Sequence, residues 1–258
     1  MAEETKQENL AEGTLISHLL ELRNRLMRAL LAVIVALIPC VYYQNQLFTF
    51  ISRPIREKLP KDATLIATGV MSPFITPLKL AMFASIFIAM PVILYQVWAF
   101  VAPGLYKHEK RFAIPLLASS VVLFYLGVGF AYEFVFPTVF GYFAGATPEG
   151  VKWMADITQY LDFAMQMFFG FGLAFEVPIA VVLLVITGIV SLEKLKANRA
   201  YVVVGVFVVA AMVTPPDALS MCSMAVPMYL LYEGGLIMAA VMSKKRKKDG
   251  EEQEPEAK

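Results

Sequence analysis

Long apolar runs separated by short polar segments dominate the sequence. Four runs have the roughly 17 or more residues that a helix needs to cross the apolar core of a bilayer: residues 26–43, 78–101, 112–136 and 160–189. A fifth apolar block, residues 201–242, is interrupted at Thr214-Pro215-Pro216-Asp217, where proline removes backbone donors and aspartate favours a turn. This block predicts a hairpin of two helices, so we expect an all-α chain with six transmembrane helices.

The basic residues are distributed unequally over the polar segments between these runs. One alternating set of segments, which includes both chain ends, carries 16 of the 22 Lys and Arg residues, whereas the other set carries five. Lys and Arg are enriched in the cytoplasmic loops of membrane proteins. We therefore predict that both termini lie in the cytoplasm.

The polar segments differ in what they are expected to form. Residues 1–25 predict a cytoplasmic segment with an amphipathic helix on the inner membrane surface, because leucines recur there at helical spacing. Residues 26–242 form the predicted transmembrane domain, and its outer segment 44–77, which four prolines divide, predicts a small cap. Residues 243–258 are too polar to fold and predict a disordered cytoplasmic tail.

Prolines also occur inside the apolar runs, at positions 39, 91, 115, 178 and 227. Membrane helices tolerate proline because neighbouring groups satisfy the freed carbonyls, and the usual result is a kink. Kinked helices favour a concave wall over a tight straight bundle.

Composition supports a membrane protein and excludes several function classes. Hydrophobic residues make up 59% of the 258 positions, against about 45–50% in soluble domains. The net charge of +1 gives no basic surface for nucleic acid. Cys40 and Cys222 each lie in an apolar run, so we expect buried free thiols, with a bridge between them as the alternative.

Catalytic and metal-binding patterns are missing from the sequence. Only His18 and His108 could supply imidazole, and His108-Glu109 lacks the second histidine of a zinc-binding helix. No Gly-x-Ser-x-Gly segment occurs. We therefore predict no enzyme activity, no catalytic residues, no metal and no cofactor.

Three carboxylates are candidates for function. Glu176 lies inside an apolar run, about 21 Å along a helix from Asp162, and is expected near the bilayer midplane. It either has the structural role of hydrogen-bonding neighbouring helices together or has a functional role. Glu21 and Glu109 lie among cations on the predicted cytoplasmic side, where local ion pairing, such as Glu21 with Arg25, is the alternative to a functional role.

Five sequence segments resemble the TatC family of the gammaproteobacterial type, in the same order and across nearly the whole chain. They are His18-Leu19-Leu20-Glu21-Leu22-Arg23-Asn24-Arg25, Tyr95 to Leu105, Tyr106 to Arg111, Phe175-Glu176-Val177-Pro178 and Thr214-Pro215-Pro216-Asp217. The resemblance implies a multi-pass protein of the bacterial inner membrane that is the receptor and core subunit of twin-arginine protein export. It implies that TatB and TatA are partners in a multimeric complex, and that the proton-motive force drives translocation of folded proteins.

The resemblance also implies roles for particular residues. Glu21 and Glu109 would receive the two arginines of the signal peptide, and Phe100, Leu105 and Lys107 would shape that cytoplasmic patch. This pairing is chemically reasonable, because a planar guanidinium can form two hydrogen bonds with one carboxylate whereas lysine offers a point charge.

Four further positions match sites that are functionally sensitive in the family. They are Glu176 within the membrane and Pro54, Pro216 and Asp217 at the outer face. Three other functions remain open from the residues alone: a proton-coupled secondary transporter, suggested by Glu176 and the kinked spans, an intramembrane enzyme, and a structural scaffold.

Overall fold

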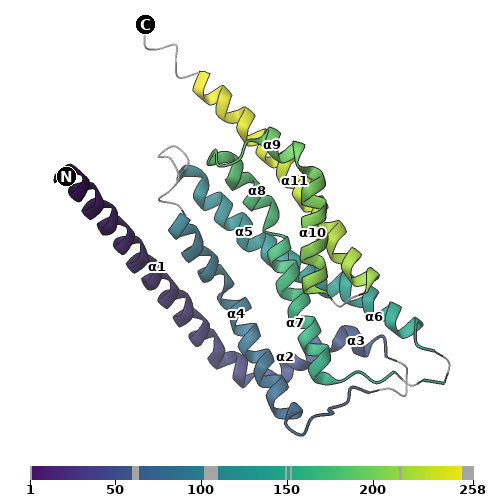
Figure 1. Cartoon of the computed structure of the whole chain (residues 1–258). Helices are drawn as coiled ribbons and strands as arrows, with labels where there is room; N and C mark the ends of the chain where they lie inside the picture. Colours follow the sequence, from purple (N-terminus) through teal and green to yellow (C-terminus); the bar gives the residue numbers. More distant parts are fainter. Residues whose placement is uncertain are drawn as a thin grey trace.

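The computed structural model of the chain is an elongated bundle of helices (Figure 1). It describes residues 2–59, 64–101, 110–148, 150–151, 153–214 and 217–251. The helices are α1 (Ala2–Tyr42), α2 (Gln44–Ile51), α3 (Arg53–Arg56), α4 (Ser72–Val101), α5 (Lys110–Phe130), the π-helical η2 (Ala131–Val135), α6 (Phe136–Gly145), α7 (Ile157–Ala174), α8 (Val177–Ile186), α9 (Leu192–Ala197), α10 (Arg199–Val213) and α11 (Ala218–Glu251).

Five helical stretches in the described residues are long and apolar enough to cross a membrane. They are Leu19–Tyr42, Ser72–Phe100, Ile114–Gly145, Ile157–Ile186 and Ala218–Lys244. Helix α10 is apolar but shorter. The predicted all-α membrane fold is therefore confirmed. The sixth crossing at α10, the orientation in the membrane and the concave wall remain predictions.

Proline acts differently in different helices. Pro39 and Pro91 lie inside α1 and α4, which continue through them. Pro178 instead lies in the first turn of α8, so the predicted single run 160–189 is two helices joined at Phe175 and Glu176. Proline lacks a backbone donor and is tolerated in a first turn, where that donor has no helical partner.

Helices at both ends of the chain run across two of the expected domain boundaries, and the domain division itself remains a prediction. Helix α1 runs without a break across the predicted boundary between residues 25 and 26. Helix α11 continues to Glu251, whereas residues 243–258 were predicted to be a disordered tail. An established helix propagates readily into lysine and arginine, which have high helix propensity. Residues 252–258 lie outside the described residues.

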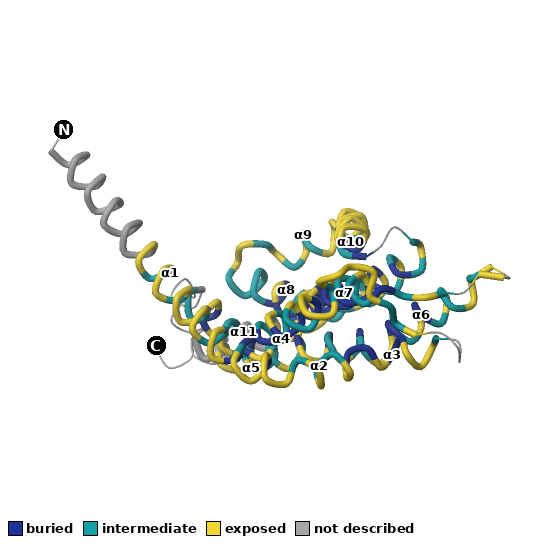
Figure 2. Tube along the Cα trace, turned by 90° about the horizontal axis from the view of Figure 1, so that it is seen from below, coloured by how far each residue is buried: buried dark blue, intermediate teal, exposed yellow. Residues whose placement is uncertain are grey.

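Helix α7 forms the centre of the main core. Its buried side chains include Leu161, Met167, Phe168 and Phe171, which pack against α4, α5, η2 and α6. A second core joins α8 and α11 around Val182. Figure 2 shows buried residues concentrated in and around α7, whereas α10 and the described part of α1 are largely exposed.

Glycine allows two of the helix contacts. A Cβ on Gly127 of α5 would lie 2.4 Å from the carbonyl oxygen of Phe171, and one on Gly235 of α11 would lie 2.8 Å from the Cα of Pro178. Small residues let helix backbones approach closely where apolar side chains alone give no net drive to associate. The α5–α7 and α8–α11 contacts therefore depend on these positions.

The two cysteines have different surroundings. Both are free, as expected, and Cys40 is buried. Cys222 is exposed rather than buried because it lies on a face of α11 that no neighbouring described helix covers. No group of three or more metal-ligating side chains occurs within the described residues.

Candidate functional site

The functional candidates lie at two ends of the helix bundle. The outer end, named after its predicted orientation, carries α2, α3 and residues 64–71 and 146–156 (Figure 1). The opposite end, here the cytoplasmic end, carries α9, the last turn of α4 and the part of α1 around Glu21. The two ends are joined by α4, α5, α7, α8, α10 and α11.

Glu21 forms the local ion pair that its spacing predicted. Its Oε1 accepts hydrogen bonds from Nε of Arg25 at 2.9 Å and from Nη2 at 2.5 Å. The side chain of Glu21 is 37% exposed and that of Arg25 is 19% exposed. A guanidinium group is therefore already held against this carboxylate, at a site that solvent can reach.

Phe100 is half-buried near the end of α4, the helix along which α1 packs. Trp98, one turn from that end, donates from Nε1 to the hydroxyl of Ser120 at 3.2 Å and ties α4 to α5. The other predicted members of the peptide-binding patch, Leu105, Lys107 and Glu109, lie outside the described residues. The structure therefore describes Glu21 and Phe100 of the predicted patch.

Glu176 lies in the break between α7 and α8, with an accessibility between buried and exposed. The side chain of Ser120 lies near its carboxyl group. The Oε1 atom is buried and has no hydrogen-bond partner among the described residues. Since Trp98 also bonds Ser120, Glu176 belongs to a polar group that links α4, α5 and the α7–α8 break.

At the outer end, Pro54 is buried in the first turn of α3. Asp217 caps α11, because its Oδ1 accepts from the amide of Ser220 at 2.7 Å, whereas its Oδ2 is buried without a partner among the described residues. The predicted turn is present, since α10 ends at Val213 and α11 begins at Ala218. Pro216 lies outside the described residues.

The sequence analysis did not identify Asp156, the carboxylate that accepts the most hydrogen bonds among the described residues. Its side chain accepts from the amide and hydroxyl of Thr68, at 2.9 and 2.7 Å, and from the amides of Thr158 and Gln159 at the start of α7, at 2.8 and 3.2 Å. These bonds, of which the Thr68 hydroxyl contributes most, lower the pKa of Asp156 from 3.8 to about 2. An aspartate just before an apolar run is an N-cap signal, but a partner 88 residues away leaves no local pattern.

Other polar contacts join α2 and α4 to the first turns of α7. The hydroxyl of Tyr160 donates to the carbonyl of Ile51, and the hydroxyls of Thr76 and Thr158 lie 3.1 Å apart. Lys79, in the second turn of α4, forms an ion pair with Asp162. The outer end is thus tied to the central helix α7 by polar contacts between distant parts of the chain.

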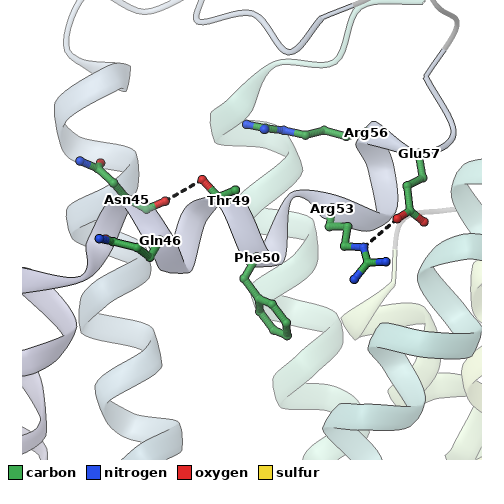
Figure 3. Close-up of a pocket in the computed structure, with 7 residues that line it drawn as sticks. All are labelled: Asn45, Gln46, Thr49, Phe50, Arg53, Arg56 and Glu57. Carbon is green, nitrogen blue, oxygen red and sulfur yellow. Dashed lines mark hydrogen bonds and ion pairs between the residues drawn. The ribbon is translucent and has the colours of Figure 1, made fainter.

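A groove of about 690 Å³ also lies at the outer end, along α2 and α3 (Figure 3). Phe50 and Arg53 project from one side of this segment, and Arg53 bonds Glu57 at 2.7 Å. The groove is lined by Asn45, Gln46, Thr49, Phe50, Arg53, Arg56 and Glu57. It lies at the other end of the bundle from Glu21, so it does not form part of the predicted peptide site.

Comparison with known proteins decides the family. Residues 17–227 match the family model described as "Sec-independent protein translocase protein (TatC)". The chain belongs to the TatC family. Two bacterial TatC proteins, both called Sec-independent protein translocase protein TatC, are similar over most of their length. The protein of Azotobacter chroococcum is 54% identical over 226 residues, 88% of this chain and 89% of the relative. That of Escherichia coli K12 is 51% identical over 225 residues, 87% of each chain.

A solved structure agrees with this assignment. The crystal structure of the twin arginine translocase receptor TatC superposes with a TM-score of 0.78 at 34% identity, over 88% of this chain and 99% of that chain. TatC proteins are translocase components of the bacterial inner membrane, which agrees with the five apolar helices of spanning length. The family assignment does not favour the transporter alternative, and TatC is not an enzyme family.

Proposed function

We propose that the chain is the receptor and core subunit of a twin-arginine protein translocase. In this proposal it binds the Arg-Arg signal peptides of folded proteins at its cytoplasmic end and works with TatB and TatA in a multimeric complex. The observation that supports it most directly is the contact between Glu21 and Arg25, in which a partly exposed carboxylate already accepts two hydrogen bonds from a guanidinium group.

An arginine of the peptide could take the place of Arg25. Partly exposed pairs at this spacing contribute only about 0.3–0.5 kcal/mol, so releasing Arg25 costs little. A bound peptide would shield this carboxylate from water, where a hydrogen bond to a charged group contributes about 1.5–3 kcal/mol. Guanidinium offers two parallel donors to one carboxylate and ammonium does not, so the exchange favours arginine over lysine in the peptide.

Glu109 is proposed to receive the second arginine, with Phe100, Leu105 and Lys107 around it. Phe100 lies in the last turn of α4, the helix that packs along α1. Arg23 and Arg28 are exposed on α1 and repel a cationic peptide. The bonds to the two carboxylates must outweigh this repulsion, which makes an isolated basic peptide a poor ligand.

Glu176 is proposed to act after docking. Its buried acceptor Oε1, which has no partner among the described residues, is a group that an inserted peptide or a TatA helix could satisfy. The proton-motive force would drive this later step by changing the protonation of the Glu176 carboxyl group. Pro54, Pro216 and Asp217 are proposed to keep the outer turns in the geometry that the complex requires.

Photocrosslinking of a signal peptide tests the proposal. A probe next to the two arginines should crosslink to the wild-type chain in membranes, and Glu21→Gln or Glu109→Gln should lower the apparent affinity about tenfold or more. The double variant should abolish the crosslink. Glu176→Ala should keep the arginine-region crosslink and lose that from the apolar core of the peptide.

Glu193→Gln is the matched control, because Glu193 is another carboxylate at the cytoplasmic end, in the first turn of α9. It should crosslink like the wild type. A twin-lysine peptide should bind weakly to the wild type, and Glu21→Gln should lower its affinity little further. If Glu176→Ala abolished the arginine-region contact while the Glu21 and Glu109 variants kept it, the proposed site would be wrong.

A further inference from the structure

A basic cavity at the cytoplasmic end lies between α9, α10 and α11, away from the proposed peptide site. Its volume is about 220 Å³. Charged side chains line its mouth and apolar side chains line the rest: Lys196, Arg199, Glu233, Leu236, Ile237, Ala240, Val241 and Lys244. Neither the family assignment nor the proposed function gives this cavity a ligand.

Glu233, the only carboxylate among the described residues that line the cavity, is already satisfied. Glu233 accepts from Nε of Arg199 at 2.7 Å and from Nη2 at 2.8 Å, and the hydroxyl of Tyr229 donates to it at 2.9 Å. These bonds neutralise Arg199 and fix its position. Lys196 and Lys244 form no ion pair with any described residue, so within the described lining these two positive charges are not compensated.

Two of the apolar side chains that line the cavity are exposed on the outer surface of the helix bundle. Ile237 is 65% exposed and Val241 is 62% exposed, on the same helix as Lys244. A ligand with an anionic group and hydrocarbon chains would contact both parts of the lining. A free anion would leave these apolar side chains uncovered.

The length of α10 places the mouth where a lipid headgroup could reach it. Its 15 residues span about 22 Å, less than the roughly 30 Å apolar core of a bilayer. A short helix draws the adjacent leaflet inward. Arg199 is the first residue of α10, and the positive end of the helix dipole lies there.

We propose that this cavity binds the phosphate headgroup of an anionic phospholipid of the inner leaflet, with its acyl chains along Ile237 and Val241. Lys196 and Lys244 contact the phosphate, while Arg199, held by Glu233, maintains the shape of the mouth. Basic pockets between helices at the cytoplasmic side are suited to anionic headgroups. The site is independent of signal-peptide binding, so either proposal can fail without the other.

Native mass spectrometry of the purified full chain, titrated with phosphatidylglycerol or phosphatidylcholine, tests the proposal. The wild type should bind one phosphatidylglycerol at least about tenfold more tightly than phosphatidylcholine. Lys196→Gln with Lys244→Gln should remove most of this preference, because each cation near a membrane surface strengthens anionic lipid binding several-fold. Ala240→Leu fills the cavity without changing charge and should weaken phosphatidylglycerol binding as well.

The matched control is Lys58→Gln with Lys194→Gln, which removes the same charge from positions outside the cavity lining. It should keep the wild-type preference. Equal affinities for the two lipids, an equal loss in the control, or displacement of bound lipid by millimolar inorganic phosphate would overturn the proposal. If the double lysine variant has a lowered unfolding temperature, Ala240→Leu and the phosphate competition decide the question.

Discussion

Two carboxylates at opposite ends of the molecule have contrasting surroundings. Asp156 is buried and accepts four hydrogen bonds, two of them from Thr68, 88 residues away. Glu21 is 37% exposed and, among the described residues, bonds Arg25, one helical turn away. A carboxylate saturated by distant donors stabilises the fold. One held by a single local partner can exchange that partner for a ligand.

The backbone around these residues differs in the same way. Residues 66 and 156 form an isolated parallel bridge, with Ile66 donating to Ala155 at 3.0 Å and accepting from Ile157 at 2.9 Å. Glu21 lies on a helix that contacts mainly α4. In an apolar 18-residue stretch of Leu19–Tyr42 11% of the residues are buried, against 44% in the corresponding stretch of Ile157–Ile186. Hydrogen bonds between distant segments thus hold the outer end together. Helix α1, in contrast, leaves one face accessible.

The largest expected effect is that of breaking the Asp156 junction. Asp156→Ala removes the cap of α7 and leaves the amide and hydroxyl of Thr68 without their partner, which should cost about 2–4 kcal/mol. Thermal unfolding in detergent should show a fall of several degrees. Asp162→Ala, which breaks only the exposed pair with Lys79, is the control and should cost less than about 1 kcal/mol. Equal losses would remove the special role of Asp156.

A smaller effect is expected from acid. The pKa of Asp156 is about 2 in the folded chain, whereas the ordinary value of 3.8 applies to the unfolded chain. At pH values between these two, the unfolded chain therefore binds more protons than the folded chain. The stability that Asp156 contributes is therefore fully present above about pH 4 and is lost as the pH falls toward 2. Unfolding temperatures measured from pH 6 to pH 3 should fall more for the wild type than for Asp156→Asn. Parallel curves would show that another group controls the acid response.

The sequence predicted local contacts and left out the distant ones. The Glu21–Arg25 pair and the turn before Ala218 follow from spacing and from turn residues that act within a few positions. The partner of Asp156 depends on how two outer segments meet, and no local pattern records that. Pro178, expected to kink its helix, lies in the first turn of α8, directly after the interruption between α7 and α8. Its Cα lies against Gly235 of α11. This contact joins distant parts of the chain, and no local sequence pattern predicts it.

The smallest expected effect tests whether the partner of Glu21 is exchangeable. If Arg25 competes with the signal peptide for this carboxylate, Arg25→Gln should increase the affinity for a twin-arginine peptide. The gain should be about twofold, because a partly exposed pair at this spacing contributes about 0.3–0.5 kcal/mol. A titration of crosslinking yield against peptide concentration would measure it.

Removing any cation from α1 also reduces the repulsion of a basic peptide, and Arg28→Gln isolates that contribution. Arg28 is exposed on the same helix and forms no ion pair with a described residue. Arg25→Gln should therefore raise the affinity about twofold more than Arg28→Gln does. A loss of affinity in Arg25→Gln alone would instead mean that Arg25 holds Glu21 in its binding conformation. Glu21 would then resemble Asp156 more closely, as a carboxylate whose existing partner must remain in place.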